Sequence, residues 1–310
     1  MENRKQILWA VAFLLAAALT GACLYCYPAW KAAGIVQEKM DGSGFSYELQ
    51  VELDWENQPA EQRKAFEILA KLTGIRKESL CRLTIKGGTQ EDRIHMTIYP
   101  EGKTEPLAEF FFDNDSGVIN ETMLYNAIRG NLAGQYKVLE YLMPRQKEDL
   151  YMTLEQVEQL LGMDFSGIRD FRLAMADSEM TVKQYFVILM AMKREKQEGG
   201  YLFARETEAA DLSIHVPSDS ADSALVMRFR VQNPAEMIPK GEWLLSWIGI
   251  EMPDADLQAL KSISVVLASD EEGTVAMPTN FVNQDIIDIL SKVRAWLRET
   301  FSGEDSGNSL

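Results

Sequence analysis

Two cysteines are the first residues whose type and spacing suggest chemistry. Cys23 and Cys26 form a C-x-x-C pair, which supports thiol–disulfide exchange or metal binding where polar surroundings favour the thiolate. Here the pair lies at the end of an apolar run, which disfavours the reactive thiolate. We therefore expect neither a redox role nor a metal role for the pair. Cys81 is the third and last cysteine, so the body beyond residue 30 is expected to hold no internal disulfide.

The two histidines, His95 and His215, are the next candidates for catalysis or metal binding. Each lies in an alternating segment, "RIHMTIY" or "DLSIHV", on the side opposite the apolar residues. This pattern predicts surface positions on strands. Because no His, Cys or carboxylate cluster has ligand spacing, we expect no metal and no cofactor.

A run of carboxylates could perform acid–base chemistry. Glu48, Glu52, Asp54 and Glu56 follow one edge of a predicted strand. A glycosidase needs two carboxylates about 5–10 Å apart, one of them with a raised pKa in a cleft. Alternate positions on an exposed strand meet the distance but not the burial, so we expect a solvated face. Because the chain also lacks G-x-S-x-G, Walker and dinucleotide motifs, we expect no enzyme.

The turn "DNDSG" has some of the features of a calcium loop, because Asp113 and Asp115 are two residues apart. An EF-hand would need a further oxygen ligand at the position of Gly117 and a Glu at that of Leu124. Asp, Asn and Gly also tolerate the backbone angles of tight turns. We therefore expect a hairpin turn here and no calcium site.

The strongest signal of location is the segment 7–27, "ILWAVAFLLAAALTGACLYCY", which contains no charged residue. As a helix it would be about 31 Å long, enough to span a hydrocarbon core of roughly 30 Å. Arg4 and Lys5 precede it, so the positive-inside rule predicts a cytoplasmic N-terminus and an extracytoplasmic body. We expect a single-pass protein of the cell membrane, of bacterial type.

The end of this segment, "LTGAC", resembles a bacterial lipobox, in which small residues precede a lipidated cysteine. The resemblance would make Cys23 the lipidation site and the mature N-terminus. Thr20 stands where the motif usually has Leu, and "LYCYPAW" follows where a polar tether is typical. These departures favour an uncleaved signal-anchor, with the lipoprotein as the alternative.

The body is strongly acidic. Beyond residue 30 the chain carries 29 basic and 46 acidic residues, a net charge of −17. Such a surface repels phosphate backbones, so no nucleic-acid partner is expected. The expected partners are the membrane, through residues 7–27, and either an apolar ligand or an envelope protein.

The remaining pattern predicts an α+β fold of curved antiparallel sheets covered by helices. We expect a stub and anchor at 1–30, a juxtamembrane helix and linker at 31–44, and a disordered tail at 302–310. Between them, a β-rich lobe over 45–150 contains an inserted helix at 58–73. A helical segment and second β-rich lobe occupy 151–301.

Two stretches share a plan that suggests two similar lobes. Residues 109–128 and 264–290 each read as an apolar strand, an acidic turn ending in Gly, a second strand and an apolar helix. Of the helical segments, "TLEQVEQLLG" begins with a capping box formed by Thr153 and Gln156. The stretch 181–200 is expected to be a helix, although its middle could also be a buried strand.

This arrangement over residues 45–130 and 200–297 resembles the lipoprotein-carrier-like half-barrels, and also uncharacterised membrane-anchored exported proteins of Gram-positive bacteria. The first resemblance implies a half-open barrel with an apolar interior and no catalysis. We therefore expect a non-enzymatic binding protein that cradles a lipid or other apolar ligand. The alternatives are an envelope interaction module with a filled core and, less favoured, a cell-envelope hydrolase.

The ligand contacts are expected on the apolar side of the alternating strands and on two tryptophans that share one face of a possible helix. Without a cavity, these side chains would simply pack as core. The expected set is Tyr47, Leu49, Val51, Leu53, Trp55, Ile94, Met96, Ile98, Trp243 and Trp247.

Overall fold

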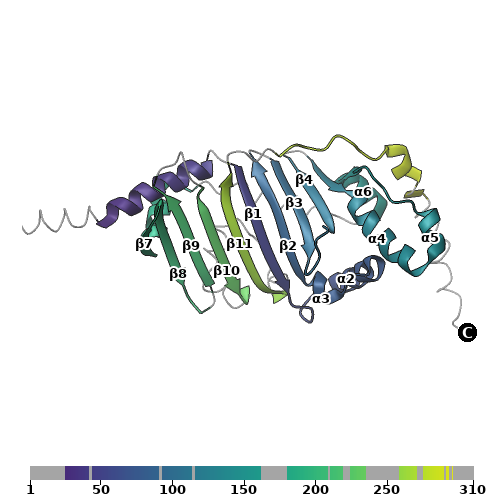
Figure 1. The fold of residues 1–310 in the computed structure, drawn as a ribbon, viewed down its shortest axis with the longest axis horizontal. Coiled ribbons are helices and arrows are strands. Elements are labelled where there is room, and N and C mark those ends of the chain that lie inside the picture. The colour runs from purple at the N-terminus through teal and green to yellow at the C-terminus, as the bar shows by residue number, and fades with distance from the viewer. Residues whose placement is uncertain are drawn as a thin grey trace, which may run out of the picture.

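The computed structural model describes most of the chain beyond the N-terminal segment. The described residues are 25–41, 44–90, 93–113, 116–161, 180–208, 210–218, 224–234, 258–270, 275–289, 291, 292 and 295. They contain an eleven-stranded antiparallel sheet in the order β6-β5-β4-β3-β2-β1-β11-β10-β9-β8-β7, which does not close into a barrel (Figure 1). The expected α+β class and antiparallel pairing are confirmed.

The first six strands run outward from the centre of the sheet. They are β1 (Gly44–Leu53), β2 (Arg82–Gln90), β3 (Arg93–Pro100), β4 (Ala108–Phe112), β5 (Gly117–Asn120) and β6 (Tyr151–Thr153). The strand predicted from the alternating residues 45–55 is present as β1, although β1 ends at Leu53, before Trp55. Alternation produces a strand here because every second side chain faces the core.

The other five strands return to the centre. They are β7 (Lys193–Gln197), β8 (Gly200–Glu206), β9 (Ala210–Pro217), β10 (Val226–Gln232) and β11 (Leu260–Asp270). Strand β11 pairs with β1, with Leu49 opposite Val265, so the first and last strands join both halves into one sheet.

The helix expected over 181–200 is wrong in its second half. Helix α8 covers only Val182–Met190, and the helix-forming residues after it form edge strand β7. The reason is the hairpin with β8: Gln197 lies opposite Gly200, and Gly199 closes the turn at φ +82°. Positive φ is inexpensive only for glycine, so the "QEGG" segment is the hairpin signal.

A helix over residues 25–41, called here the N-terminal helix, packs against the second half of the sheet. Ala29, Ala32, Ala33 and Val36 are at most 3% exposed, and their spacing places them on one helix face. They share a core with α8 and with β8 to β11, which includes the fully buried Phe203. The segment expected as a juxtamembrane helix and linker is thus helical up to residue 41, and this helix contributes to the core.

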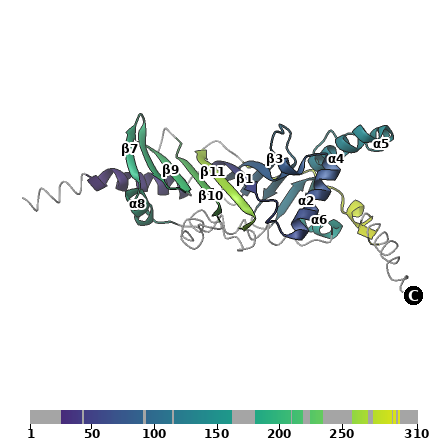
Figure 2. The ribbon, with the colours of Figure 1, turned by 90° about the horizontal axis from the view of Figure 1, so that it is seen from below.

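Further helices lie at the opposite end of the sheet. They include α2 (Ala60–Thr73), α3 (Lys77–Leu80), α4 (Glu121–Gln135), α5 (Lys137–Leu142) and α6 (Leu154–Leu161). Residues 284–289 are also helical, as expected for the end of the stretch 264–290. Figure 2 shows α8 below one end of the sheet, with α2 and α6 below the other. The predicted capping box is confirmed: Gln156 N donates to Thr153 Oγ1 at 3.2 Å, and Thr153 N donates to Gln156 Oε1 at 3.1 Å.

Two expectations near the ends of the chain need separate mention. The second strand expected within 264–290, at residues 274–278, is absent from 275–278. Side chains rather than a neighbouring strand hold Val275: its N–H donates to Gln90 Oε1 and its carbonyl accepts from Arg93. Within the described part of the chain, no helix has the length and apolar character needed to span a bilayer. Residues 1–24, with most of the expected anchor, and the tail 302–310 lie outside the described residues.

Candidate functional site

The strand registers divide the sheet into an apolar and a polar face. One row of opposed residues reads Phe229, Val265, Leu49, Ile85 and Ile98, from β10 to β3. The neighbouring row reads Arg230, Ser264, Gln50, Thr84 and Tyr99. Because successive side chains point to opposite faces, the two rows lie on opposite sides of the same five strands.

Most of the predicted ligand contacts lie together on the apolar face. On β1 they are Tyr47, Leu49, Val51 and Leu53, and on β3 they are Ile94, Met96 and Ile98. Burial changes along the apolar row that runs from β10 to β3. Phe229 on β10 is 4% exposed, whereas Val265, Leu49, Ile85 and Ile98 are half-buried. We call the region of these four residues the central strip.

Trp55 does not belong to this strip. It follows the end of β1 and packs edge-on against Phe66 of α2, with ring centroids 6.5 Å apart. The Lys77 ammonium lies 5.1 Å from its ring centroid. Trp55 therefore links the β1 end to α2 and α3. Trp243, Trp247 and the candidate lipidation residue Cys23 lie outside the described residues.

Tyr47 marks the point where the apolar face is most tightly packed. It lies opposite Gly87, and its hydroxyl donates to the His95 carbonyl oxygen at 2.9 Å. A Cβ on Gly87 would collide with that carbonyl oxygen and with the Tyr47 hydroxyl. Burial raises the pKa of Tyr47, so the phenol stays protonated and keeps donating.

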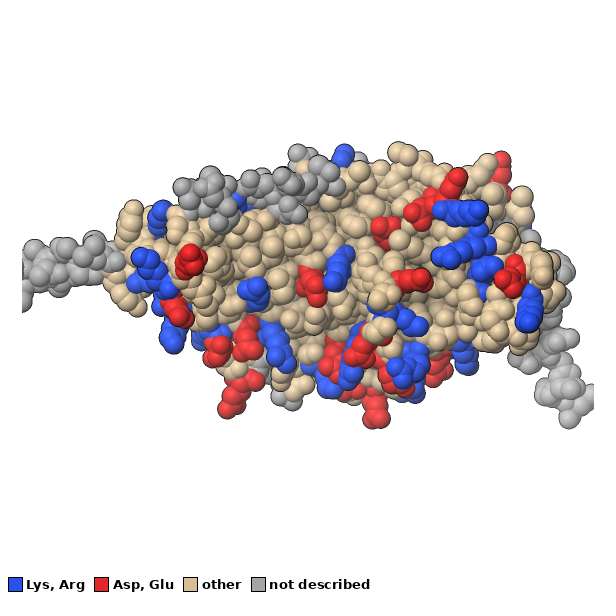
Figure 3. All heavy atoms as spheres, viewed as in Figure 1, with Lys and Arg blue, Asp and Glu red and all other residues tan. Residues whose placement is uncertain are grey.

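A hollow of about 900 Å³ lies on the polar face, around β1, β2, β10, β11 and the turn after β3. Its polar lining comes from Glu48, Gln50, Glu52, Arg82, Thr84, Lys86, Tyr99, Glu101, Lys103, Thr104, Arg230, Ser262 and Ser264. Figure 3 shows mixed acidic and basic side chains on this side of the molecule, densest along the lower edge.

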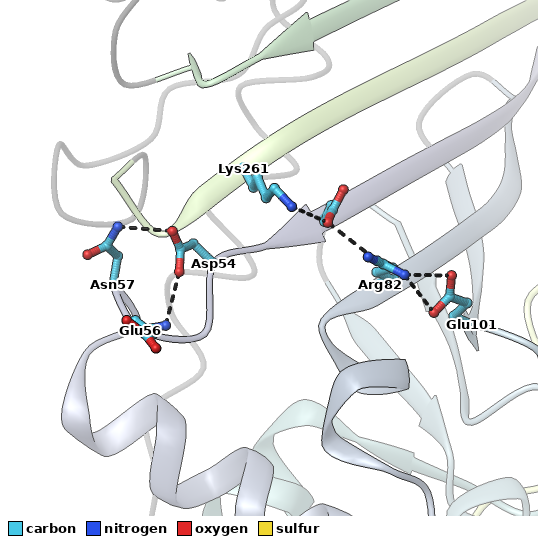
Figure 4. A network of polar contacts seen from close by, with 7 residues as sticks. Asp54, Glu56, Asn57, Arg82, Glu101 and Lys261 are labelled. Atoms are coloured by element: carbon cyan, nitrogen blue, oxygen red, sulfur yellow. Dashed lines mark hydrogen bonds and ion pairs between the residues drawn. The ribbon is translucent and has the colours of Figure 1, made fainter.

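Most of the charges in this hollow neutralise one another (Figure 4). Lys261 Nζ lies 2.8 Å and Arg82 Nε 3.3 Å from the same Glu52 oxygen, and Arg82 also contacts Glu101 at 3.1 Å. The hydrogen bond and the charge of Lys261, followed by the charge of Arg82, hold the pKa of Glu52 below its ordinary value despite partial burial. The expected solvated face thus contains a connected network of ion pairs.

Two basic residues of the hollow have no acidic partner in the described part of the chain. Glu48 pairs with Lys86 at 3.3 Å and accepts a hydrogen bond from Gln50 at 2.9 Å. Within the described residues, Lys103 and Arg230 form no ion pair with an acidic side chain. They are therefore the basic side chains of the hollow that no carboxylate of the described residues neutralises.

His95 also lies in a denser environment than its pattern predicted. Its Nε2 is 2.9 Å from Glu109 Oε1, and its ring stacks on Phe111 with centroids 4.5 Å apart. Asn120 and Tyr151 donate to the other Glu109 oxygen at 2.8 and 3.3 Å. Burial alone would raise the pKa of Glu109, but the hydrogen bonds from His95, Asn120 and Tyr151 outweigh it and lower that pKa.

This cluster does not have the geometry of a catalytic triad. The Thr97 hydroxyl lies 3.3 Å from His95 Nε2, the same ring nitrogen that contacts Glu109. A triad needs the nucleophile and the orienting carboxylate on opposite ring nitrogens. The lowered pKa of Glu109 also suits an ionised hydrogen-bond acceptor rather than a general acid. Among the described residues, no group of three or more His, Cys, Asp and Glu is placed to hold a metal ion.

Sequence reasoning missed the hollow and the Glu109 cluster for one reason. Both form across strands: Thr97 on β3 lies opposite Glu109 on β4, and Asn120 on β5 lies opposite Tyr151 on β6. Alternation within a strand shows which face a residue is on, but not which residue lies opposite. The turn at Asp113 was predicted correctly: its carboxylate accepts from Ser116 N at 2.7 Å and from Ser116 Oγ at 2.9 Å.

Comparison with known proteins adds no relative to this picture: no family model matches the chain, and neither the curated proteins nor the solved structures contain a match.

Proposed function

We propose that this protein is a non-enzymatic, membrane-anchored extracytoplasmic binding protein that holds a lipid or other apolar ligand against the central strip. The observation that supports it is the change in burial along one apolar row. Leu212 and Phe229 are 7% and 4% exposed, whereas Val265, Leu49, Ile85 and Ile98 of the same face are half-buried. A row of partly exposed aliphatic side chains suits an apolar ligand.

The proposal also includes three more detailed features that were expected from the sequence. They are the span over 7–27, a curved cradle of the carrier-like kind, and two similar lobes. The open, eleven-stranded sheet with helices beneath both ends is compatible with such a cradle.

A pair of neighbouring residues gives a direct test. Ile85 lies on the apolar face and Thr84 on the polar face of β2. Ile85→Ser should weaken binding of a fluorescent phospholipid about tenfold, because burying an aliphatic side chain contributes roughly 1.5–3 kcal/mol. Thr84→Ser is the matched control and should bind as the unaltered chain does. Equal binding by all three chains, with unchanged thermal unfolding, would contradict the proposal.

A second function, the docking of an envelope protein, is favoured by the hollow on the polar face. There the ligand would be polar, and Lys103 and Arg230 would meet acidic groups of the partner. A photo-crosslinker at Thr84 tests this function against one at Ile85. A protein crosslinked only from Thr84, with no lipid bound by the chain, would favour docking over lipid binding.

A further inference from the structure

The end of the sheet formed by β7 exposes a group of aromatic side chains. Tyr25, Tyr27 and Trp30 in the first turns of the N-terminal helix are 63%, 65% and 47% exposed. Trp30 packs edge-on against Phe186 of α8 with ring centroids 5.3 Å apart, and Val187, the next residue, is 65% exposed. Aromatic side chains with a polar tip favour the membrane–water interface.

Contacts with β7 join the start of the N-terminal helix to the body. Arg194 of β7 donates to the Tyr25 carbonyl at 2.9 Å, and its guanidinium lies 5.3 Å from the Tyr25 ring and 5.9 Å from the Tyr201 ring. Ala29, one helical turn further on, is 1% exposed. The start of the helix therefore lies against the sheet, as its later turns do.

The charge at this end is opposite to that of the chain as a whole. This end contains five basic and only two acidic residues, counted over β7 and its turn, the first turn of α8 and the first turns of the N-terminal helix. The basic residues are Lys31, Lys183, Lys193, Arg194 and Lys196, and the acidic ones are Glu195 and Glu198. The entire chain has a net charge of −16. A basic and aromatic surface on an acidic protein complements anionic headgroups.

The sequence before this surface indicates what it meets. Residues 7–24 are uncharged and apolar and lead directly into Tyr25. A signal-anchor and a lipidated Cys23 would both attach the chain to the bilayer within a few residues of Tyr25. The residues near Tyr25 would thus meet the bilayer whether the chain is held by a signal-anchor or by a lipid on Cys23.

We propose that this end of the molecule docks directly on anionic lipid headgroups, so that the sheet stands away from the bilayer with β7 nearest to it. The docking surface consists of Tyr25, Tyr27, Trp30 and Val187 with Lys183, Lys193 and Lys196. The inference depends on the membrane address in the proposed function. It adds a fixed orientation, in which α5 is the element farthest from the membrane (Figure 1).

Two valines provide a matched pair of probes. Val187 on α8 is 65% exposed and Val138 on α5 is 63% exposed. The two helices lie at opposite ends of the molecule (Figure 2). The full chain would carry Val187→p-benzoylphenylalanine or Val138→p-benzoylphenylalanine in vesicles of phosphatidylglycerol mixed with phosphatidylcholine. After flotation and irradiation, mass spectrometry would count lipid adducts on each chain.

We expect lipid adducts from position 187 and severalfold fewer from position 138. Each lysine near an anionic surface raises the affinity for that surface roughly fivefold. The triple substitution K183Q/K193Q/K196Q should therefore greatly reduce the adducts at 187. The control K137Q/R145Q/K147Q, at the far end, should not. Equal adducts from both positions, or no effect of the three lysines, would overturn the docking. A chain that fails to float with the vesicles would overturn the membrane address itself.

Discussion

At the scale of single residues, the closest packing on the apolar face of β1 and β2 lies at Tyr47 and Gly87. The Tyr47 ring fits over Gly87, where no side chain competes for the space, and its hydroxyl reaches the His95 carbonyl. Gly88 is the next residue and faces the polar side, where a Cβ would meet only the Phe45 carbonyl at 3.2 Å. The two adjacent glycines therefore have different structural roles.

Gly87→Ala should destabilise the protein by about 1–3 kcal/mol, because overpacking forces the backbone and Tyr47 to move. Gly88→Ala is the matched control and should cost distinctly less. Tyr47→Phe should cost about 1 kcal/mol through the lost hydrogen bond. Urea unfolding of the three variants measures these differences, and equal losses for the two glycine variants would contradict this account.

The Glu109 cluster predicts a pH dependence. Because the pKa of Glu109 is lowered in the folded state, its ionised form stabilises the fold above the ordinary value of 4.5. This contribution should be lost as the pH falls through 4.5 toward the lower, folded-state pKa. The difference in free energy of unfolding between the unaltered chain and Glu109→Gln should shrink over that window. Urea unfolding at a series of pH values measures it, and a difference that stays constant with pH would refute the pairing.

At the scale of elements, the N-terminal helix is a core element rather than a tether. Its alanines allow close approach to the sheet, and Ala33 and Val36 are completely buried. The sequence indicated a short helix after the apolar run. It could not show that this helix packs on β8 to β11, because those strands lie some 170 residues later in the chain.

A chain that begins at residue 42 should therefore lose cooperative unfolding, since the apolar surface of β8 to β11 would be exposed. A chain that begins at residue 25 should unfold in a single transition. Differential scanning calorimetry separates the two outcomes. A sharp transition in the shorter chain would show that the helix is dispensable.

Elements with a clear local pattern could be predicted from the sequence, whereas strand β7 could not. Strong alternation identified β1 and β3, and the Thr–Gln spacing identified the cap of α6. In contrast, Lys193–Gln197 is rich in helix formers and becomes a strand only by pairing with β8. Gly199→Ala should destabilise that hairpin by about 1 kcal/mol because of its positive φ. Faster amide hydrogen exchange confined to β7 and β8 would confirm this prediction, and unchanged exchange would contradict it.

At the scale of the whole molecule, one continuous sheet separates an apolar face from a polar face. Its edges are protected against further strand pairing: β6 has only three residues, and β7 carries Lys193, Glu195 and Lys196. The α+β class followed from the sequence pattern, as did most of the residues on the apolar face. The pairing of β1 with β11 and the ion-pair network at Glu52 could not be predicted, since both join residues about 200 positions apart.

The central claim is that the central strip holds an apolar ligand, and native mass spectrometry of the full chain tests it most directly. We expect the chain released from detergent to carry an additional mass equal to a lipid, and Val265→Trp to lose that mass by filling the strip. Thr84→Ser, on the opposite face, should retain it. A chain that carries no lipid, or a lipid that persists in Val265→Trp, would contradict the account.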